Sequence, residues 1–153
     1  MPEIADLAPD FTLPRDGGDT VTLSEQRPAP VVLFFYPKDD TSGCTKEAIA
    51  FTGLNAEFEK AGVKVFGISK DTVAKHDKFR DKHSLGIPLL SDAEGEVCEQ
   101  YGVWKEKSMY GKKYMGIERT TVLVGGDGKI VRIWPKVKVP GHAEEVLEAV
   151  RAL

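Results

Sequence analysis

One cysteine in this sequence stands where a thiol would be chemically active. Cys44 lies in the segment YPKDDTSGCTKEAI, directly after the apolar run VVLFFY. Thr41 or Ser42 is a natural N-cap for a helix that begins here, which would place Cys44 in the first turn. The amide N–H groups of that turn have no helical acceptors, and together with the helix dipole they favour a negative charge. The location therefore favours the thiolate, which is the nucleophilic form of cysteine.

The helix that carries Cys44 also predicts the surroundings of the sulfur. The free N–H groups of its first turn can hold a small, oxygen-rich substrate. Glu47 lies where it could complete a capping box if Cys44 is residue N1 or N2. Cys44, Phe51 and Phe58 are spaced by seven, so each returns to within about 20° of the last around the helix. The sulfur is expected to point into a partly desolvated pocket, where a cation would be needed to hold its charge.

The elements around this helix alternate between strands and helices. Residues 31–36 and 63–69 are continuous apolar runs, as expected of strands buried on both faces. Apolar residues spaced by three or four predict a helix from residue 42 to about 60, with Gly62 as a stop signal. We also expect short strands at 21–24 and 87–91, a polar surface helix from 72 to about 84, and a turn with a short helix around Cys98.

The last third of the chain has a different pattern. Two apolar segments, 120–124 and 129–134, flank the turn GGDG and predict an antiparallel hairpin. An amphipathic helix follows at 142–153. This order predicts an α/β protein with a thioredoxin-like fold, in which a central mixed β-sheet has helices on both faces. Residues 1–153 are expected to form one such domain.

Composition and charge narrow the classes of function. The chain has 153 residues, 41% hydrophobic and 29% charged, which suits a single globular domain. Its formal net charge of −3 offers no broad cationic surface for nucleic acid. No apolar run approaches the roughly 20 residues that span a membrane, and the start MPEIADLAPDF lacks the features of a secretory signal. With only two cysteines, the chain is expected to work in the reducing cytoplasm.

The histidines show no spacing that is typical of a metal site. His76 and His83 are a heptad apart on a polar helix, and His142 is remote from both. We therefore expect solvated or half-buried histidines, with neither a metal nor another cofactor. The lysines of the segment KEKSMYGKK, shortly before Arg119, are expected to lie in a solvated loop. Alternatively, they raise the potential near Cys44 or dock an acidic reductant.

The residues around Cys44 resemble a known family. Pro37, Thr41 and Cys44 match the P-x-x-x-T-x-x-C pattern of peroxiredoxins. The wider segment FYPKDDTSGCTKEA is similar to the bacterioferritin-comigratory, or Q-type, branch of that family. The resemblance continues through LLSDAEGEVCEQYGVW, KSMYGKKYMGIERTTVLV and the closing hairpin, so it covers nearly the whole chain.

This resemblance implies a thiol peroxidase that reduces hydrogen peroxide and organic hydroperoxides. Cys44 would be the peroxidatic cysteine, which attacks the peroxide and becomes a sulfenic acid. Thr41 would hydrogen-bond the thiolate and the substrate oxygen, and the amides of Gly43 and Cys44 would bind peroxide oxygen. Arg119 would supply the cation, unless it forms a surface ion pair with an acid such as Glu118. Pro37 would shield the pocket.

The chain departs from the family pattern at the position of the partner sulfur. Relatives carry a resolving cysteine where this chain has Ile49, or in the next helix, where Arg80 and its neighbours hold no sulfur. Cys98 remains, and its apolar flank predicts a small buried core residue. We therefore expect a one-cysteine mechanism with an external reductant, namely thioredoxin, glutaredoxin or a low-molecular-weight thiol. Ser42 replaces the usual proline, which alters loop stiffness rather than chemistry.

Three alternatives remain open at this point. In the first, Cys98 acts as the resolving cysteine of a two-cysteine mechanism. In the second, the protein is a peroxide sensor or an interaction protein, whose partners change when Cys44 is oxidised. The third is a disulfide oxidoreductase of thioredoxin or glutaredoxin type. Its dithiol version fails because Cys44 lacks the second cysteine of a C-x-x-C motif, which leaves a monothiol site with a glutathione groove. Each alternative is compatible with a monomer or a weak dimer, which is the oligomeric state that we expect.

Overall fold

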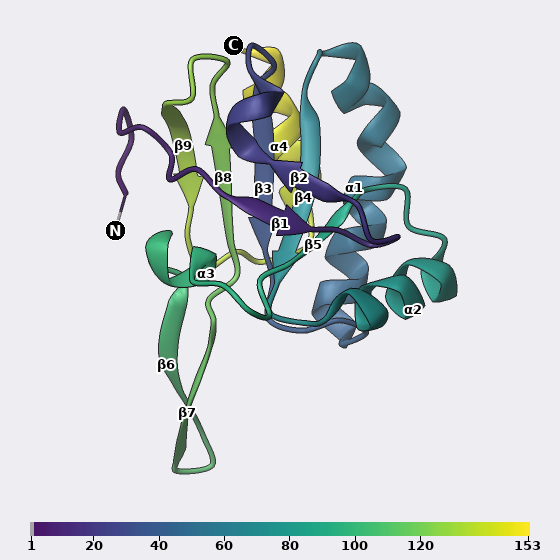
Figure 1. Ribbon diagram of the computed structural model, residues 1–153, viewed down its shortest axis with the longest axis vertical. Coiled ribbons are helices and arrows are strands. Elements are labelled where there is room, and N and C mark those ends of the chain that lie inside the picture. The colour runs from purple at the N-terminus through teal and green to yellow at the C-terminus, as the bar shows by residue number, and fades with distance from the viewer. Residues whose placement is uncertain (1) are drawn as a thin grey trace.

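The computed structural model describes residues 2–153, and its centre is a five-stranded sheet with the strand order β5-β4-β3-β8-β9 (Figure 1). Strands β3, β4 and β5 run parallel to one another, β8 runs antiparallel to β3, and β9 runs antiparallel to β8. The mixed sheet is therefore the one predicted. Its strands are β3 (Val31–Phe35), β4 (Lys64–Ser69), β5 (Leu89–Ser91), β8 (Thr120–Val124) and β9 (Ile130–Trp134).

Strand β3 lies in the middle of the sheet and is buried along its whole length. Because successive side chains of a strand point to opposite faces, β3 contributes to two separate apolar cores. Leu33 and Phe35 pack into the core on one face, and Phe34 and Tyr36 pack into the core on the other. The sheet thus divides the protein into two layers of core side chains.

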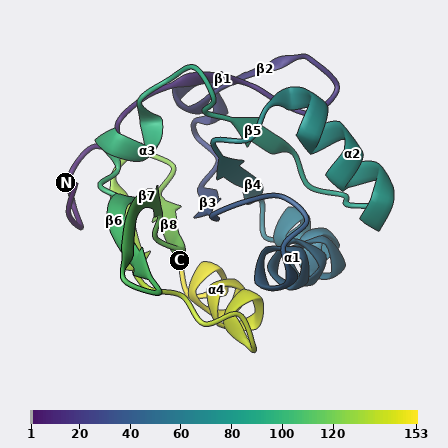
Figure 2. The same ribbon diagram turned by 90° about the horizontal axis from the view of Figure 1, so that it is seen from below.

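The longer helices cover one face of the sheet. Figure 2 shows α1 and α4 side by side on that face, with α2 beside the β5 edge. Cys44, Phe51 and Phe58 form the buried stripe of α1 that the spacing of seven predicted. The helices are α1 (Ser42–Lys60), α2 (Val73–His83), α3 (Val97–Gln100) and α4 (His142–Arg151).

Shorter elements cover the opposite face. They are the two-stranded ribbon of β1 (Thr12–Pro14) and β2 (Thr20–Thr22), the 3-10 helix η1 (Leu23–Gln26) and the helix α3. The strand expected at 21–24 is thus shorter than predicted, because the chain turns into η1 at Leu23. Both faces carry helical elements, but the long ones lie on the face that holds Cys44.

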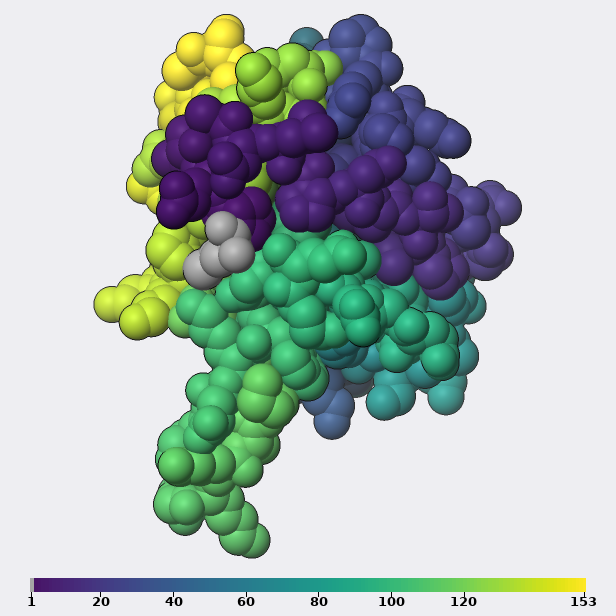
Figure 3. Space-filling view, turned by 60° about the vertical axis from the view of Figure 1, so that its left-hand side comes forward, coloured from purple at the N-terminus to yellow at the C-terminus, as the bar shows by residue number. Residues whose placement is uncertain are grey.

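A second hairpin was not predicted. Strands β6 (Trp104–Met109) and β7 (Lys112–Ile117) pair with one another and form the lysine-rich segment that was expected to be a loop. The hairpin projects from the body of the protein (Figure 3). Its residues show no regular alternation of apolar and polar types, because much of it has no buried face, so the usual sequence signal of a strand is missing.

Helices that could cross a bilayer are not found between residues 2 and 153, since none combines sufficient length with sufficient apolarity.

The packing of β3 against β4 leaves no room for a side chain at Gly67. A Cβ atom there would lie 2.7 Å from Cζ of Phe34. We expect Gly67→Ala to lower the free energy of unfolding by about 2 kcal/mol, because the Phe34 ring must shift in a full core. In the matched control Gly53→Ala, a Cβ in helix α1 meets open space. That substitution should raise the free energy of unfolding by about 0.5 to 1 kcal/mol, as measured by urea denaturation. Equal effects would contradict the packing account.

Candidate active site

The first turn of α1 carries Cys44 at the edge where β3 ends. Thr41 is the N-cap, so Cys44 is the third residue of the helix, and its side chain is almost fully buried, with 1% exposure. The expected capping box is therefore wrong. Glu47 lies a full turn beyond the helix start, no side chain caps the helix, and the Glu47 carboxylate is buried on the same side as the sulfur.

Arg119 reaches this turn from the segment between β7 and β8. Its Nη2 lies 3.3 Å from the sulfur of Cys44, and its Nη1 donates to Oε1 of Glu47 over 2.7 Å. A single guanidinium group therefore joins two acidic groups of one helix. The surface pair with Glu118 is not formed, because Glu118 pairs with Lys105 instead.

Close packing and a backbone hydrogen bond hold this guanidinium in place. A Cβ atom at Gly43 would lie 3.1 Å from Nη2 of Arg119, so the absence of a side chain allows the close approach. The carbonyl oxygen of Arg119 accepts a hydrogen bond from the amide of Val137, 2.9 Å away. Arg119 is thus fixed at both its backbone and its side chain.

Glu47 is a candidate functional residue, although its position in the sequence had predicted only a role in capping the helix. Burial raises the pKa of Glu47 to about 7, and Arg119 offsets that rise only in part. Oε1 accepts from Arg119, whereas Oε2 is buried without a hydrogen-bond partner. Its spacing of three from Cys44 was the available signal, since residues three apart on a helix share a face.

The remaining residues of the predicted site lie in the loop before α1 and in its first turn. The hydroxyl group of Thr41 donates to the carbonyl of Lys38 over 2.8 Å, which leaves its oxygen free to accept a hydrogen bond. The amides of Gly43 and Cys44 lie in the first turn, where helical acceptors are lacking. Pro37 is half-buried in the loop directly after β3. This arrangement offers one acceptor, two amide donors and one cation around a thiol.

A buried ion pair holds the loop before Cys44. Nδ1 of His76, on α2, lies 2.6 Å from Oδ2 of Asp39, and the hydroxyl of Tyr36 donates to the other carboxylate oxygen over 2.6 Å. Nε2 of His76 donates to the carbonyl of Leu90 over 2.9 Å. Although burial opposes the charge, the hydrogen bond and charge of Asp39 hold the pKa of His76 above its usual range.

Two of the histidines differ from expectation. His76 is fully buried, with 0% exposure, and His142 is buried beside Thr121, whose hydroxyl lies 2.8 Å from Nε2. The prediction of solvated or half-buried side chains was wrong for both, because their helices present them to the core rather than to solvent. His83 is half-buried, as expected. Within residues 2–153 no three side chains of His, Cys, Asp or Glu are grouped so as to hold a metal.

A second cation near the sulfur comes from the unpredicted hairpin. Lys107 of β6 is half-buried, and burial together with the neighbouring Arg119 lowers its pKa, while the negative charge of Cys44 acts in the opposite direction. The sequence held no signal for this proximity, because the hairpin itself was not foreseen.

Cys98 lies outside this arrangement, in the other core layer. It is fully buried in α3, in the core layer that contains Phe35, whereas Cys44 belongs to the layer on the other face of the sheet. Its amide donates to Oδ2 of Asp92 over 2.8 Å. Burial and the charge of Asp92 raise the pKa of the Cys98 thiol well above its ordinary value. Cys98 is the buried core residue that was expected.

The chain is similar to known proteins over nearly its whole length. Residues 4–133 match the family model described as the AhpC/TSA family. A Bcp peroxiredoxin of Coxiella burnetii is 52% identical over 145 residues, which cover 95% of this chain and 96% of the relative. Peroxiredoxin Bcp of Bacillus subtilis is 44% identical over 149 residues, which cover 97% of this chain and 95% of the relative.

The fold of this chain is also similar to that of a solved structure. The bacterioferritin comigratory protein of Xanthomonas campestris, studied for its alkyl peroxide reduction activity, matches with a TM-score of 0.91 at 43% identity. The match covers 99% of this chain and 97% of that protein. The thioredoxin-like fold is thereby confirmed.

The contact between Glu47 and Arg119 predicts a dependence on pH. Below about pH 7 Glu47 becomes protonated, and Arg119 loses the anion that holds it. We expect the rate constant for oxidation of Cys44 by hydrogen peroxide to show a step near pH 7, falling toward lower pH, that is absent in Glu47→Gln. Glu47→Leu should lower the rate constant about tenfold, because a displaced cation stabilises the reacting charge poorly. Identical pH profiles for the native chain and Glu47→Gln would show that Glu47 does not position Arg119.

The ion pair of His76 predicts a loss of stability when it is broken. We expect His76→Ala to lower the free energy of unfolding by about 3 kcal/mol, because it leaves the Asp39 carboxylate buried without its cation. His83→Ala is the matched control on the same helix, where the pair with the exposed Asp40 should contribute far less to the free energy of unfolding.

The same pair sets a direction for the effect of pH on stability. Since the pKa of His76 is raised on folding, its contribution is fully present below the unfolded value of 6.5. It is lost as the pH rises through the folded pKa. Urea denaturation of the native chain and of His76→Ala should therefore give a difference that shrinks above pH 6.5. A difference that grows with pH would contradict a protonated His76.

Proposed function

The chain belongs to the AhpC/TSA family and is a thiol peroxidase of the Bcp peroxiredoxin type. On that premise we propose that it reduces alkyl hydroperoxides and hydrogen peroxide at Cys44 by a one-cysteine mechanism. The observation that carries the assignment is the buried sulfur of Cys44 with the Arg119 guanidinium 3.3 Å away. The alkyl peroxide reduction reported for the Xanthomonas campestris relative supports the substrate class.

The oxidation step transfers one oxygen atom to sulfur. The Cys44 thiolate attacks the distal oxygen of the hydroperoxide, an S–O bond forms, and the O–O bond breaks. The leaving alkoxide takes up a proton, so the thiol and ROOH yield Cys44–SOH and ROH. Arg119 and the first-turn amides face the oxygens on which negative charge develops, and Thr41 accepts the hydrogen bond of the peroxide hydrogen.

The contacts around the sulfur support this division of roles. The Arg119 guanidinium is already anchored on Glu47, so no rearrangement is needed to bring it to the reacting atoms. The hydroxyl proton of Thr41 is engaged by the carbonyl of Lys38, which directs its lone pairs outward. Half-buried Pro37 shields the site and has no N–H group of its own that could compete for the substrate.

Reduction of the sulfenic acid is assigned to an external thiol. Of the positions that carry a resolving cysteine in relatives, Ile49 is exposed, and Arg80 forms an ion pair with Asp16 over 3.1 Å. Cys98 belongs to the core layer on the other face of the sheet from Cys44, which argues against a direct disulfide between them. Its buried thiol is also in the protonated, unreactive form.

The external thiol closes the cycle in two steps. A first thiol attacks Cys44–SOH, which gives a mixed disulfide and water. A second thiol then attacks the mixed disulfide, releases Cys44 as a thiol and leaves the reductant as a disulfide. Thioredoxin, glutaredoxin and low-molecular-weight thiols of the cytoplasm are the reductants that fit this chemistry.

One equivalent of hydrogen peroxide tests the mechanism. We expect the native chain and Cys98→Ser each to lose one titratable thiol, to gain the mass of one oxygen atom, and to turn over equally with a thiol reductant. Cys44→Ser should neither gain the oxygen nor turn over. Intact-protein mass, a free-thiol count and steady-state peroxide consumption are the measurements.

Two outcomes would overturn the proposal. If the native chain loses both thiols and Cys98→Ser stalls after one oxidation, Cys98 is the resolving cysteine, and the mass shows whether the bridge joins one chain or two. If Cys44 is oxidised once but never regenerated by thioredoxin, glutaredoxin or dithiothreitol, the chain is a sensor rather than an enzyme.

A further inference from the structure

The unpredicted hairpin is an arm that stands apart from the rest of the protein. We call the arm residues 104–117, which comprise β6, β7 and the turn between them. These two strands form a sheet of their own and do not extend the central sheet. The arm leaves the molecule at the end where α1 begins (Figures 1 and 2). A two-stranded hairpin that packs on no other sheet is only marginally stable in water, so we expect the arm to have a function.

The tip of the arm exposes large apolar side chains. Tyr110 is 98% exposed, and Met109, Tyr114 and Met115 are also exposed. Tyr110 and Gly111 form the two-residue turn with φ values of 52° and 76°, a conformation that suits asparagine and glycine but strains a bulky residue. A strained and almost fully exposed aromatic side chain is typical of a binding surface, where Tyr and Met are enriched.

The charge of the arm is opposite to that of the whole chain. The arm holds four lysines and one glutamate, whereas the chain carries a formal net charge of −3. Lys105 pairs with Glu118 and Lys113 with Glu106, but Lys112 has no ion pair among the side chains of residues 2–153. A basic arm on an acidic protein is complementary to an acidic partner, which the rest of the surface would repel.

One face of the arm connects its tip with the sulfur. In the antiparallel register Lys107 is opposite Tyr114, and Met109 is opposite Lys112, so these four side chains share a face. The stem of Lys107 lies over Gly116, where a Cβ atom would be 3.2 Å from its Cδ. Lys107 is also close enough to Cys44 and Arg119 for their charges to act on it. The face therefore runs from the site to the exposed tip.

We propose that the arm is the docking surface for an acidic protein thiol, which binds the basic and aromatic face of β6 and β7 and reduces the sulfenic acid of Cys44. The inference rests on the proposed function, because it concerns the reductant of that same cycle. The reductant contributes both thiols, and the arm contributes binding only. The Cys44 sulfur is almost fully buried, so a protein thiol needs a nearby surface that holds it while the first turn of α1 moves.

Two substitutions at the tip test the proposal without touching the site. We expect Lys112→Glu and Tyr110→Ser to lower the second-order rate constant for reduction of the sulfenic acid by an acidic thioredoxin about tenfold. Reduction by dithiothreitol and oxidation by hydrogen peroxide should keep their native rates, because neither reagent needs the arm. Rising sodium chloride should slow the reaction of the native chain with thioredoxin, and should do so less for Lys112→Glu.

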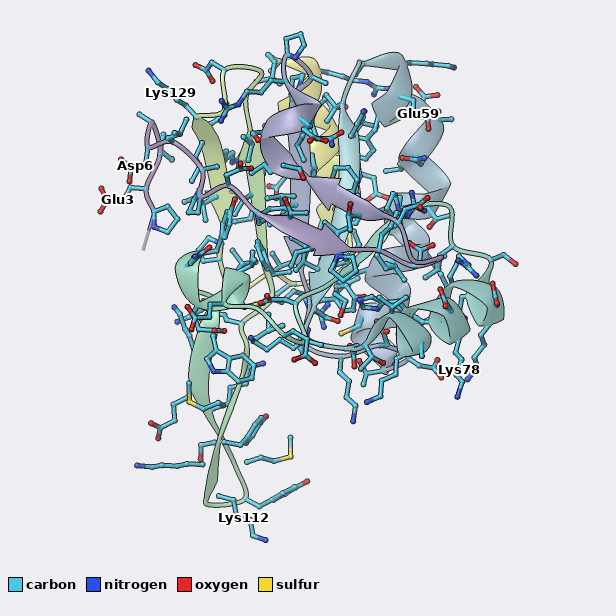
Figure 4. All side chains as sticks on the ribbon, viewed as in Figure 1. Glu3, Asp6, Glu59, Lys78, Lys112 and Lys129 are labelled. Carbon is cyan, nitrogen blue, oxygen red and sulfur yellow. The ribbon has the colours of Figure 1, made fainter. Side chains whose placement is uncertain are left out.

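Lys129→Glu is the matched control. Lys129 also follows a glycine in a hairpin turn, and Figure 4 shows it at the end of the molecule opposite to Lys112. It changes the net charge by the same amount as Lys112→Glu, so an equal loss in both variants would mean that overall charge, and not the arm, governs the reaction. Circular dichroism establishes that each variant is folded.

Other outcomes would overturn the proposal. If thioredoxin reduces both tip variants as fast as it reduces the native chain, docking on the arm is excluded. Docking is also excluded if thioredoxin reduces the native chain no faster than dithiothreitol does. The arm would instead bind membranes if the native chain co-sediments with vesicles of anionic phospholipid and Tyr110→Ser does not. In that case the rate constants for reduction by thioredoxin would be the same in both. A dimer that Tyr110→Ser dissociates, again with unchanged rates, would assign the arm to a second copy. Failure of Cys44 oxidation in the native chain would instead refute the proposed function.

Discussion

The proposed chemistry of this protein depends on one guanidinium group, that of Arg119, which contacts both a thiol and a carboxylate. Cys44 and Glu47 come from the same buried turn of α1, and a buried carboxylate such as that of Glu47 is costly unless a cation is close. Arg119 satisfies both at once from the opposite wall of the site. The position of the guanidinium depends in turn on Gly43, because a side chain there would crowd Nη2 of Arg119. The first turn of α1 and the residue directly before β8 therefore fit together only with glycine at position 43.

A second buried charge pair supports the same region from the other side. His76 on α2 holds Asp39, and through it the loop that leads from β3 into the helix of Cys44. Two contacts therefore fix the surroundings of the thiol. Arg119, directly before β8, contacts the sulfur, and His76 on α2 holds the loop that precedes α1. Together they hold the hydrogen-bond donors at the place where charge would develop during the proposed reaction. The same arrangement also buries the sulfur, so that access by a protein thiol requires motion of the first turn.

The central sheet governs what each cysteine can do. It separates the layer of Cys44 from the layer of Cys98, where burial and the charge of Asp92 outweigh the nearby Lys70 and raise the pKa of the second thiol. This separation supports the proposal that another molecule reduces the sulfenic acid. The basic arm beside the site offers a surface for that encounter, on a chain whose net charge would otherwise disfavour an acidic partner.

The sequence alone determined the fold class, the position of Cys44 in the first turn of α1, the apolar stripe that buries it and the need for a cation. These follow from periodicity and from the properties of a helix start, which are local. The family motif also indicated Arg119 as that cation. Tertiary structure decided that Glu47 faces Arg119 rather than capping the helix, that His76 is buried against Asp39, and that the lysine-rich segment is a free hairpin. Each of these depends on which elements meet in space, and a contact between residues distant in the chain leaves no periodic trace in the sequence.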